Sequence, residues 1–236
     1  MPQEFEGDLT DAVFWGADLR GATFRDVDLT GARISHAFVV DVDIDAQVDR
    51  LVVNGVDVTA YVNEHDPWHP LRSMIRATDV EGLRAAWELL ERVWGATVAT
   101  PESLPEERRH EPVDGEFTFV ETLRHVVFAM DKWFTAPVLG EPFEPMGLPN
   151  RGSLDFPWPG LEYELAPSSA DALAAFADRS TRFREFLGAA TATDLDPIVD
   201  VLENGPHPVR ECLQVVLEEA FWHNRYARRD LDRLAT

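Results

Sequence analysis

Cysteine, lysine and long apolar runs are all scarce in this sequence. Cys212 is the single cysteine and Lys132 the single lysine. One cysteine excludes a disulfide within the chain, so we expect a cytoplasmic location. No stretch approaches about 20 uninterrupted apolar residues, so no membrane span is expected. The first residues, MPQEFEGDLTD, lack the basic and apolar regions of a secretory signal.

Positive charge is also limited. The chain carries 43 acidic and 21 basic residues, which gives a net charge of −22. Such a chain repels phosphate backbones, so a nucleic acid is not an expected partner. The lack of an apolar span means that no membrane partner is expected either. The acidic excess is more simply a feature that promotes solubility. The preference for arginine over lysine, with abundant alanine, suggests a GC-rich genome.

The size and composition indicate a soluble globular protein. A length of 236 residues is enough for one ordinary domain and a small additional one. Hydrophobic residues make up 45% and charged residues 27% of the chain, as in typical globular proteins.

A strict five-residue repeat occupies the N-terminal region. Large apolar residues recur at Leu9, Phe14, Leu19, Phe24, Leu29, Ile34, Val39 and Ile44. The position two residues before each of them is small or apolar, and aspartate often lies between the two. A strand repeats every two residues and a helix every 3.6, so neither explains a period of five.

These eight units resemble the pentapeptide-repeat family, whose motif is approximately A(D/N)LXX. The resemblance implies a right-handed quadrilateral β-helix of about two turns over residues 1–47. Some long acidic members of the family imitate DNA, but two turns at about 5 Å each are too short to imitate much duplex. We therefore favour a scaffold role, such as capping or dimerisation, for this coil.

A connector is expected over residues 48–67. Its sequence LVVNGVDV predicts a small hairpin with an Asn54-Gly55 turn. The proline-containing run EHDPWHP, residues 64–70, predicts a boundary loop.

The remainder, residues 68–236, is predicted to be a four-helix bundle, so the chain as a whole is mainly α. Apolar residues at three- and four-residue steps predict four helices, over 70–98, 117–136, 168–189 and 207–234. Gly82 lies inside the first of them and indicates a break or bend near Val80–Gly82. Residues 137–167 form a long connection rich in proline and glycine. A connection of that length is a candidate for lining a site.

Three side chains on two of these helices could bind a metal ion. Glu219 and His223 lie one turn apart on the last helix, on a partly buried face. His125 lies on the second helix, at the margin of its apolar stripe. Burying a carboxylate beside an imidazole is costly unless something pairs them. A salt bridge would pair them, and so would zinc, whose catalytic sites use three protein ligands and one open position.

Two segments resemble helices of the DinB-like superfamily. They are ETLRHVVFAMDKW, residues 121–133, and LEEAFWHNRYARRDLDRL, residues 217–234. One histidine on the second helix and Glu-x-x-x-His on the last is similar to the pattern of mycothiol-dependent maleylpyruvate isomerases, whereas many other members have His-x-x-x-His. The resemblance implies one divalent metal, with zinc as the expected ion, on His125, Glu219 and His223. It also implies a low-molecular-weight thiol, mycothiol, as cosubstrate for a small electrophile, and a homodimer.

Three functions remain open from the sequence. The first is a metal-dependent thiol transferase or isomerase, because a coordinated thiol becomes a nucleophilic thiolate at neutral pH. The second is a metal-dependent hydrolase that activates water at the same site. The third is a non-catalytic interaction or stress scaffold that uses the pentapeptide coil.

Overall fold

The computed structural model describes residues 4–25, 27–100 and 104–235, and it divides the chain into two compact units. The first unit spans residues 1–46 and the second spans residues 47–236.

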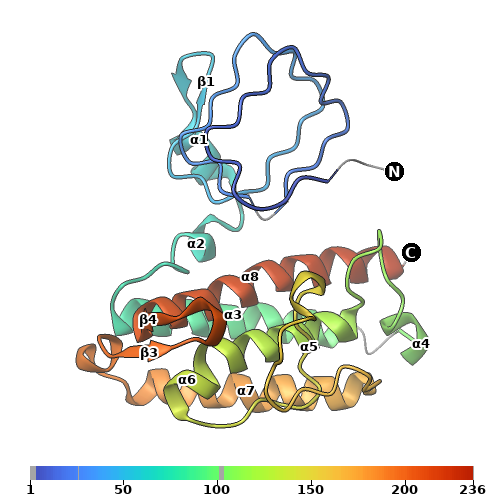
Figure 1. The fold of residues 1–236 in the computed structure, drawn as a ribbon, viewed down its shortest axis with the longest axis vertical. Helices are drawn as coiled ribbons and strands as arrows, with labels where there is room; N and C mark the ends of the chain where they lie inside the picture. The colour runs from blue at the N-terminus through green and yellow to red at the C-terminus, as the bar shows by residue number, and fades with distance from the viewer. Residues whose placement is uncertain (1–3, 26, 101–103, 236) are drawn as a thin grey trace. The chain divides into compact units, whose positions relative to one another are not determined.

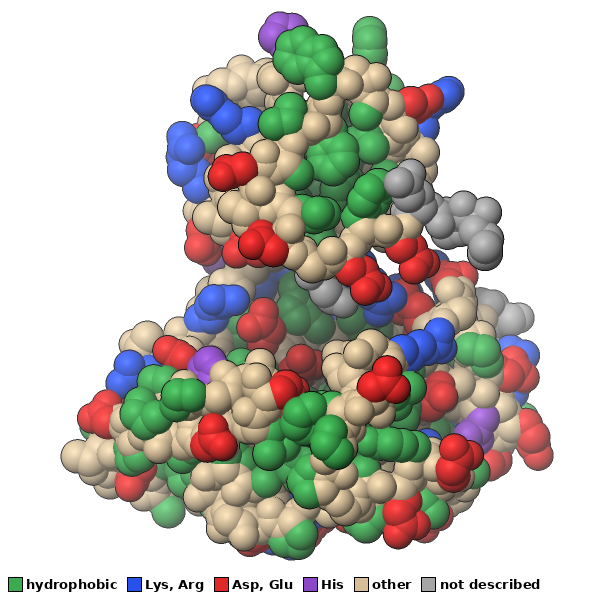
Figure 2. Space-filling model, in the orientation of Figure 1, with side chains coloured by type: hydrophobic (Ala, Val, Ile, Leu, Met, Phe, Trp, Pro, Cys, Tyr) green, Lys and Arg blue, Asp and Glu red, His purple; other side chains and the backbone are tan. Residues whose placement is uncertain are grey.

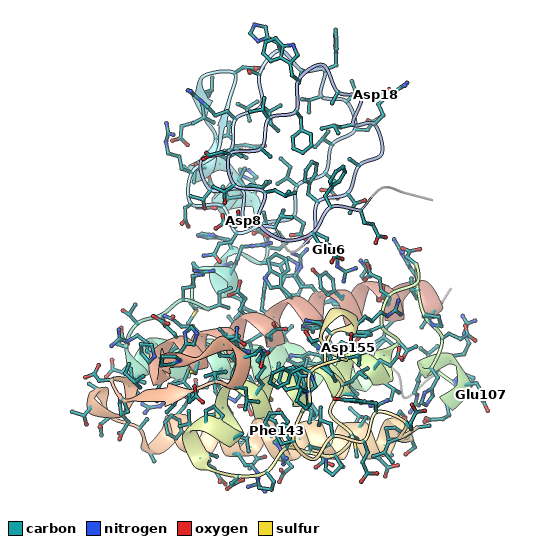
Figure 3. The ribbon with its side chains drawn as sticks, in the orientation of Figure 1. Glu6, Asp8, Asp18, Glu107, Phe143 and Asp155 are labelled. Carbon is teal, nitrogen blue, oxygen red and sulfur yellow. The ribbon has the colours of Figure 1, made fainter. Side chains whose placement is uncertain are left out.

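The first unit winds round as a coil with a five-residue period (Figure 1). Left-handed backbone recurs every five residues, at Asp11, Gly16, Gly21, Gly31, His36 and Asp41. These residues turn the corners of the coil, and glycine fills three of them because it adopts positive φ without steric cost. Asp8 and Asp18, two units apart, lie on opposite sides of the coil (Figure 3), as expected for four units per turn.

Hydrogen bonds also repeat along this coil. The backbone N–H of Ala12 donates to the carbonyl of Leu9 at 3.0 Å, and equivalent bonds form ten and twenty residues later. Hydrophobic side chains gather inside the coil (Figure 2), yet Leu9 is still 47% exposed. No strand is assigned among described residues 4–25 and 27–46, so the right-handed quadrilateral β-helix stays a prediction.

The second unit opens with the predicted hairpin. Strand β1, Val52–Val53, pairs antiparallel with β2, Val56–Asp57. Asn54 and Gly55 both have positive φ, which is the backbone that a two-residue hairpin turn requires. The boundary loop is shorter than predicted, because it is flanked by two short helices, α1 (Thr59–His65) and α2 (His69–Arg72).

Four long helices form the bundle (Figure 1). They are α3 (Val80–Ala99), α5 (Phe119–Met130), α7 (Ser169–Ala189) and α8 (Val209–Leu234). Shorter helical pieces are α4 (Glu106–Arg109), α6 (Ala136–Leu139), and 3₁₀ turns at Arg151–Ser153, Ala192–Leu195 and Leu202–Asn204. The predicted mainly helical class is thus confirmed.

The stretch predicted over 70–98 is broken before Val80, where Gly82 had indicated a break: α2 ends at Arg72 and the first bundle helix begins at Val80. Asp79 caps α3, since its Oδ1 accepts a hydrogen bond from the Gly82 N–H at 2.8 Å. A Cβ on Gly82 would lie 2.7 Å from the Cβ of Ala77. The glycine therefore lets the preceding segment pack closely against the helix start rather than continue it.

The last two helices keep nearly the predicted bounds. Helix α7 begins after Ser168, whose side chain and that of Asp171 form a reciprocal capping box. Helix α8 begins at Val209, two residues later than predicted, because residues Pro206–Pro208 form strand β4. This strand pairs antiparallel with β3, Ile198–Asp200.

The second bundle helix is interrupted by a π-helical turn that the sequence did not predict. Helix α5 ends at Met130, and residues Asp131–Thr135 form the π turn. Asp131 is fully buried there and accepts hydrogen bonds from Arg179 Nε at 2.5 Å and from the Glu144 N–H at 2.6 Å. This carboxylate ties α7 and the long connection to the end of α5.

The core joins α3 to α8 where Glu219 and His223 lie. Trp94 Nε1 donates to the carbonyl of Ala220 at 3.0 Å, and Asn224 Nδ2 donates to Thr97 Oγ1 at 3.1 Å. Both pairs are buried, so they fix the rotation of α8 about its axis.

We expect Asp131→Ala to lower the free energy of unfolding by about 3–5 kcal/mol, because it removes the fully buried partner of the Arg179 guanidinium. The matched control is Asp178→Ala. Asp178 also pairs with Arg179, at 2.6 Å, but is 45% exposed, so we expect a loss below about 1 kcal/mol. Urea denaturation measures the free energy of unfolding of both variants. Equal losses would contradict the greater contribution of the buried Asp131–Arg179 pair.

Glu106 gives a prediction for the pH dependence of stability. It accepts hydrogen bonds from the Ser169 hydroxyl and Ser169 N–H at 2.6 Å each, and these lower its pKa to about 2. The stabilisation is therefore present above pH 4.5, the ordinary value, and lost as the pH falls towards 2. Glu106→Gln should melt at a lower temperature than wild type at pH 7, and the gap should shrink below pH 4.5.

The control for this experiment is Glu107→Gln, on the same short helix, because Glu107 is exposed and lies at the outer edge of the unit (Figure 3). We expect this variant to follow the wild-type melting curve at every pH. If the difference in melting temperature between Glu106→Gln and wild type stayed constant from pH 7 to pH 3, the hydrogen bonds from Ser169 to Glu106 would not be the source of the stabilisation.

Candidate metal centre

Three side chains from two helices converge within the second unit. His125 comes from α5, and Glu219 and His223 come from successive turns of α8. One ligand atom from each lies within 4.8 Å of the others. The cluster is the one the sequence suggested, and its donor set could hold a divalent cation.

His125 is held in one tautomer by the long connection. It is 2% exposed, and its Nδ1 lies 2.8 Å from the carbonyl oxygen of Leu148. A carbonyl only accepts hydrogen bonds, so Nδ1 carries the proton and a neutral ring has its lone pair on Nε2. The sequence placed His125 at the margin of the apolar stripe of its helix, and in the structure the long connection covers that margin, so His125 is buried.

The Nε2 atom of His125 faces a carboxylate. It lies 3.5 Å from Glu219 Oε2, and it is buried with no hydrogen-bond partner among the described residues. Two lone pairs in that arrangement repel each other unless a proton or a metal ion lies between them. In a tetrahedral zinc site, nitrogen and oxygen ligands at about 2.1 Å from the metal are about 3.4 Å apart. The observed separation fits a shared cation.

His223 completes the set. Its Nδ1 lies 2.8 Å from the main-chain carbonyl oxygen of Glu219, to which it donates, and 3.2 Å from Oε2 of the same residue. The rings of His223 and His125 have centroids 4.5 Å apart. A carbonyl partner at Nδ1 is the usual way in which proteins orient a metal-binding histidine.

Glu219 is expected to be ionised. Burial raises the pKa of its carboxyl, but the neighbouring imidazoles of His125 and His223 lower it by more, so the net shift is downward. A bound divalent cation would add positive charge beside the carboxylate without protonating either imidazole.

Aromatic rings surround the cluster, and reasoning from the sequence did not single them out. Phe117 has its ring centroid 5.4 Å from that of His125, and Tyr226 has its centroid 5.9 Å from that of His223. The next residue before Phe117, Glu116, accepts a hydrogen bond from Arg229 Nη2 at 2.7 Å. The helical spacing of Tyr226, three residues after His223, could have indicated it.

Several other charged and aromatic side chains near the cluster make contacts elsewhere. Glu218 is separate from the cluster and lies 3.6 Å from Arg76. Arg225 and Arg228 lie over the ring of Trp68, at 5.5 and 5.9 Å from its centroid. Trp158, in the long connection, is buried against Phe128 and donates to the Ser153 carbonyl at 2.7 Å.

Comparison with known families identifies both parts of the chain. A family model of the DinB superfamily matches residues 89–227, and one of pentapeptide repeats matches eight copies over residues 8–44. The chain belongs to the DinB superfamily. Both resemblances seen in the sequence are therefore confirmed. No curated protein and no solved structure matches the chain. None of the described helices is long and apolar enough to cross a membrane.

Cys212 is predicted to be chemically inert in the folded protein. Its side chain is fully buried on α8, and burial raises its pKa to about 11. The thiolate is the reactive form of cysteine. We therefore expect a thiol-reactive aromatic disulfide to label no thiol in the native protein at pH 8, and one thiol per chain after unfolding in urea. Rapid labelling of the native protein would contradict the burial of Cys212.

Proposed function

We propose that this DinB-superfamily protein is a metal-dependent enzyme. His125, Glu219 and His223 hold one divalent ion, zinc, and the activated group is the thiol of a small molecule such as mycothiol. The reaction is transfer of that sulfur to a small electrophile, or isomerisation of the electrophile. The observation that carries the proposal is the buried Nε2 of His125, which faces the Glu219 carboxylate at 3.5 Å.

The ligand set favours catalysis over a purely structural metal. Three protein ligands leave one coordination position open, whereas structural zinc sites are closed by four. Glu219 and His223 are partly exposed, at 30% and 15% of their side chains. The site can therefore be reached from solvent on the α8 side while His125 stays buried. A divalent ion at this position would lower the pKa of a bound thiol or water.

The sulfur must come from outside the chain. The single cysteine is fully buried and seven residues before Glu219 on the same helix. That spacing is about 10 Å along the axis, too far to share the ion. A thiol cosubstrate is therefore required for any sulfur chemistry here. In S-transfer, the sulfur–carbon bond would form as the leaving group departs with its electron pair and the thiol proton passes to solvent.

Metal content is the first test. Elemental analysis of protein purified without chelators or metal-affinity resin should give about one equivalent of divalent metal for wild type. His223→Ala should lose it. The matched control is His207→Ala, since His207 also pairs with a glutamate four residues away, Glu211, at 3.0 Å. It should keep the metal.

Thiol dependence is the second test, and it separates the alternatives. Turnover of a small electrophile that needs both metal and a low-molecular-weight thiol would support the proposal. Metal-dependent ester or amide hydrolysis without thiol would replace it by the hydrolase. If folded wild-type protein contained no metal, the proposed metal centre would be wrong. The non-catalytic scaffold would then be the remaining function. Sedimentation of the same samples tests the homodimer that the resemblance implies.

A further inference from the structure

Residues 144–148 of the long connection run along α5 beside His125. Leu148 accepts the Nδ1 hydrogen of His125 through its carbonyl, and its own N–H donates to the carbonyl of Arg124 at 3.2 Å. Arg124 Nε in turn donates to the carbonyl of Met146 at 2.7 Å. Three hydrogen bonds thus join two residues of this segment to two consecutive residues of the helix.

The other end of the segment is fixed as well. The Glu144 N–H donates to the buried carboxylate of Asp131 at 2.6 Å, and Asp131 is held by Arg179. The Gly147 N–H donates to the Glu144 carbonyl at 2.9 Å, which closes a turn between the two ends. The segment is therefore attached to the helical body at both ends.

Gly147 allows the segment to lie this close to the helix. A Cβ at that position would lie 3.1 Å from Leu161 Cδ2, 3.2 Å from the Glu144 carbonyl oxygen and 3.4 Å from Phe128 Cβ. Phe128 lies one turn after Arg124 on α5. The close approach is thus limited by backbone and by a buried side chain, and a larger residue would displace the segment.

We propose that residues 144–148 form a strap that fixes the tautomer and ring orientation of His125, with Arg124 and Gly147 as its positioning residues. Arg124 is 7% exposed, so its guanidinium is kept in the interior where it can hold the Met146 carbonyl. Without that bond the Leu148 carbonyl would drift from Nδ1, and Nε2 would no longer be held as the acceptor. The inference rests on the proposed metal centre for its consequence, although the tautomer itself does not depend on metal.

The test combines metal affinity with a direct reading of the tautomer. Arg124→Met keeps the apolar stem and removes the donor, and we expect zinc or cobalt to bind about 10- to 100-fold more weakly in competition with a chromophoric chelator. In metal-free protein, two-bond ¹⁵N–¹H correlations should show protonated Nδ1 for His125 in wild type and a mixture of tautomers in the variant.

The matched control is Arg84→Met. Arg84 also donates to a main-chain carbonyl, that of Leu187, at 2.7 Å through Nη2. It lies ten residues before Trp94 on α3, about 15 Å along the axis from the level of the metal centre. It should lose comparable stability and keep wild-type metal affinity and the wild-type His125 tautomer.

A second variant covers the case in which Arg124→Met fails to fold. Gly147→Ala removes no hydrogen-bonding group and should still weaken metal binding. Its control, Gly152→Ala, lies in the same long connection with nothing within 4 Å of the added Cβ, and should bind as wild type. Wild-type affinity and tautomer in folded Arg124→Met or Gly147→Ala would overturn the strap. If wild type bound no metal, the proposed function would fail, and the tautomer comparison would still decide the inference.

Discussion

The packing of α5 against α8 brings His125 within 3.5 Å of Glu219, and the chemistry proposed for this protein depends on that approach. Neither helix could make the site alone, because α8 supplies only two ligands and α5 only one. The approach is held from both sides. On one side, buried hydrogen bonds from Trp94 and Asn224 fix α8 against α3. On the other, the Leu148 carbonyl fixes the imidazole of His125.

A buried imidazole next to a carboxylate is an unusual arrangement energetically. Its desolvation is costly, and two acceptors facing each other gain nothing without a cation. The fold nevertheless gives Nδ1 a hydrogen bond to a main-chain carbonyl, whereas Nε2 faces the Glu219 carboxylate without a hydrogen bond among the described residues. That asymmetry distinguishes a ligand from a histidine whose polar atoms are all satisfied within the core, and it agrees with membership of the DinB superfamily.

The three candidate ligands could be predicted from the sequence, but the residues that surround and orient them could not. Glu219 and His223 could be paired from helical spacing alone, because residues four apart lie on one face. The resemblance of residues 121–133 and 217–234 to two DinB helices added His125. Leu148 and Arg124 were missed because their roles arise from contacts between α5 and the long connection. No local periodicity predicts where a 31-residue connection returns to a helix, or which carbonyl it presents there.

The sequence by itself determined the five-residue period, the hairpin turn at Asn54-Gly55, and the four main helices, since each follows from local backbone preference or from the spacing of apolar side chains. Only the tertiary structure decided where α5 gives way to the π turn, because the buried pair of Asp131 and Arg179 forms between distant segments. It also decided that His125 is buried and holds its proton on Nδ1. The physical reason is that tautomer and burial depend on partners far away in the chain, whereas period and turn depend on neighbours.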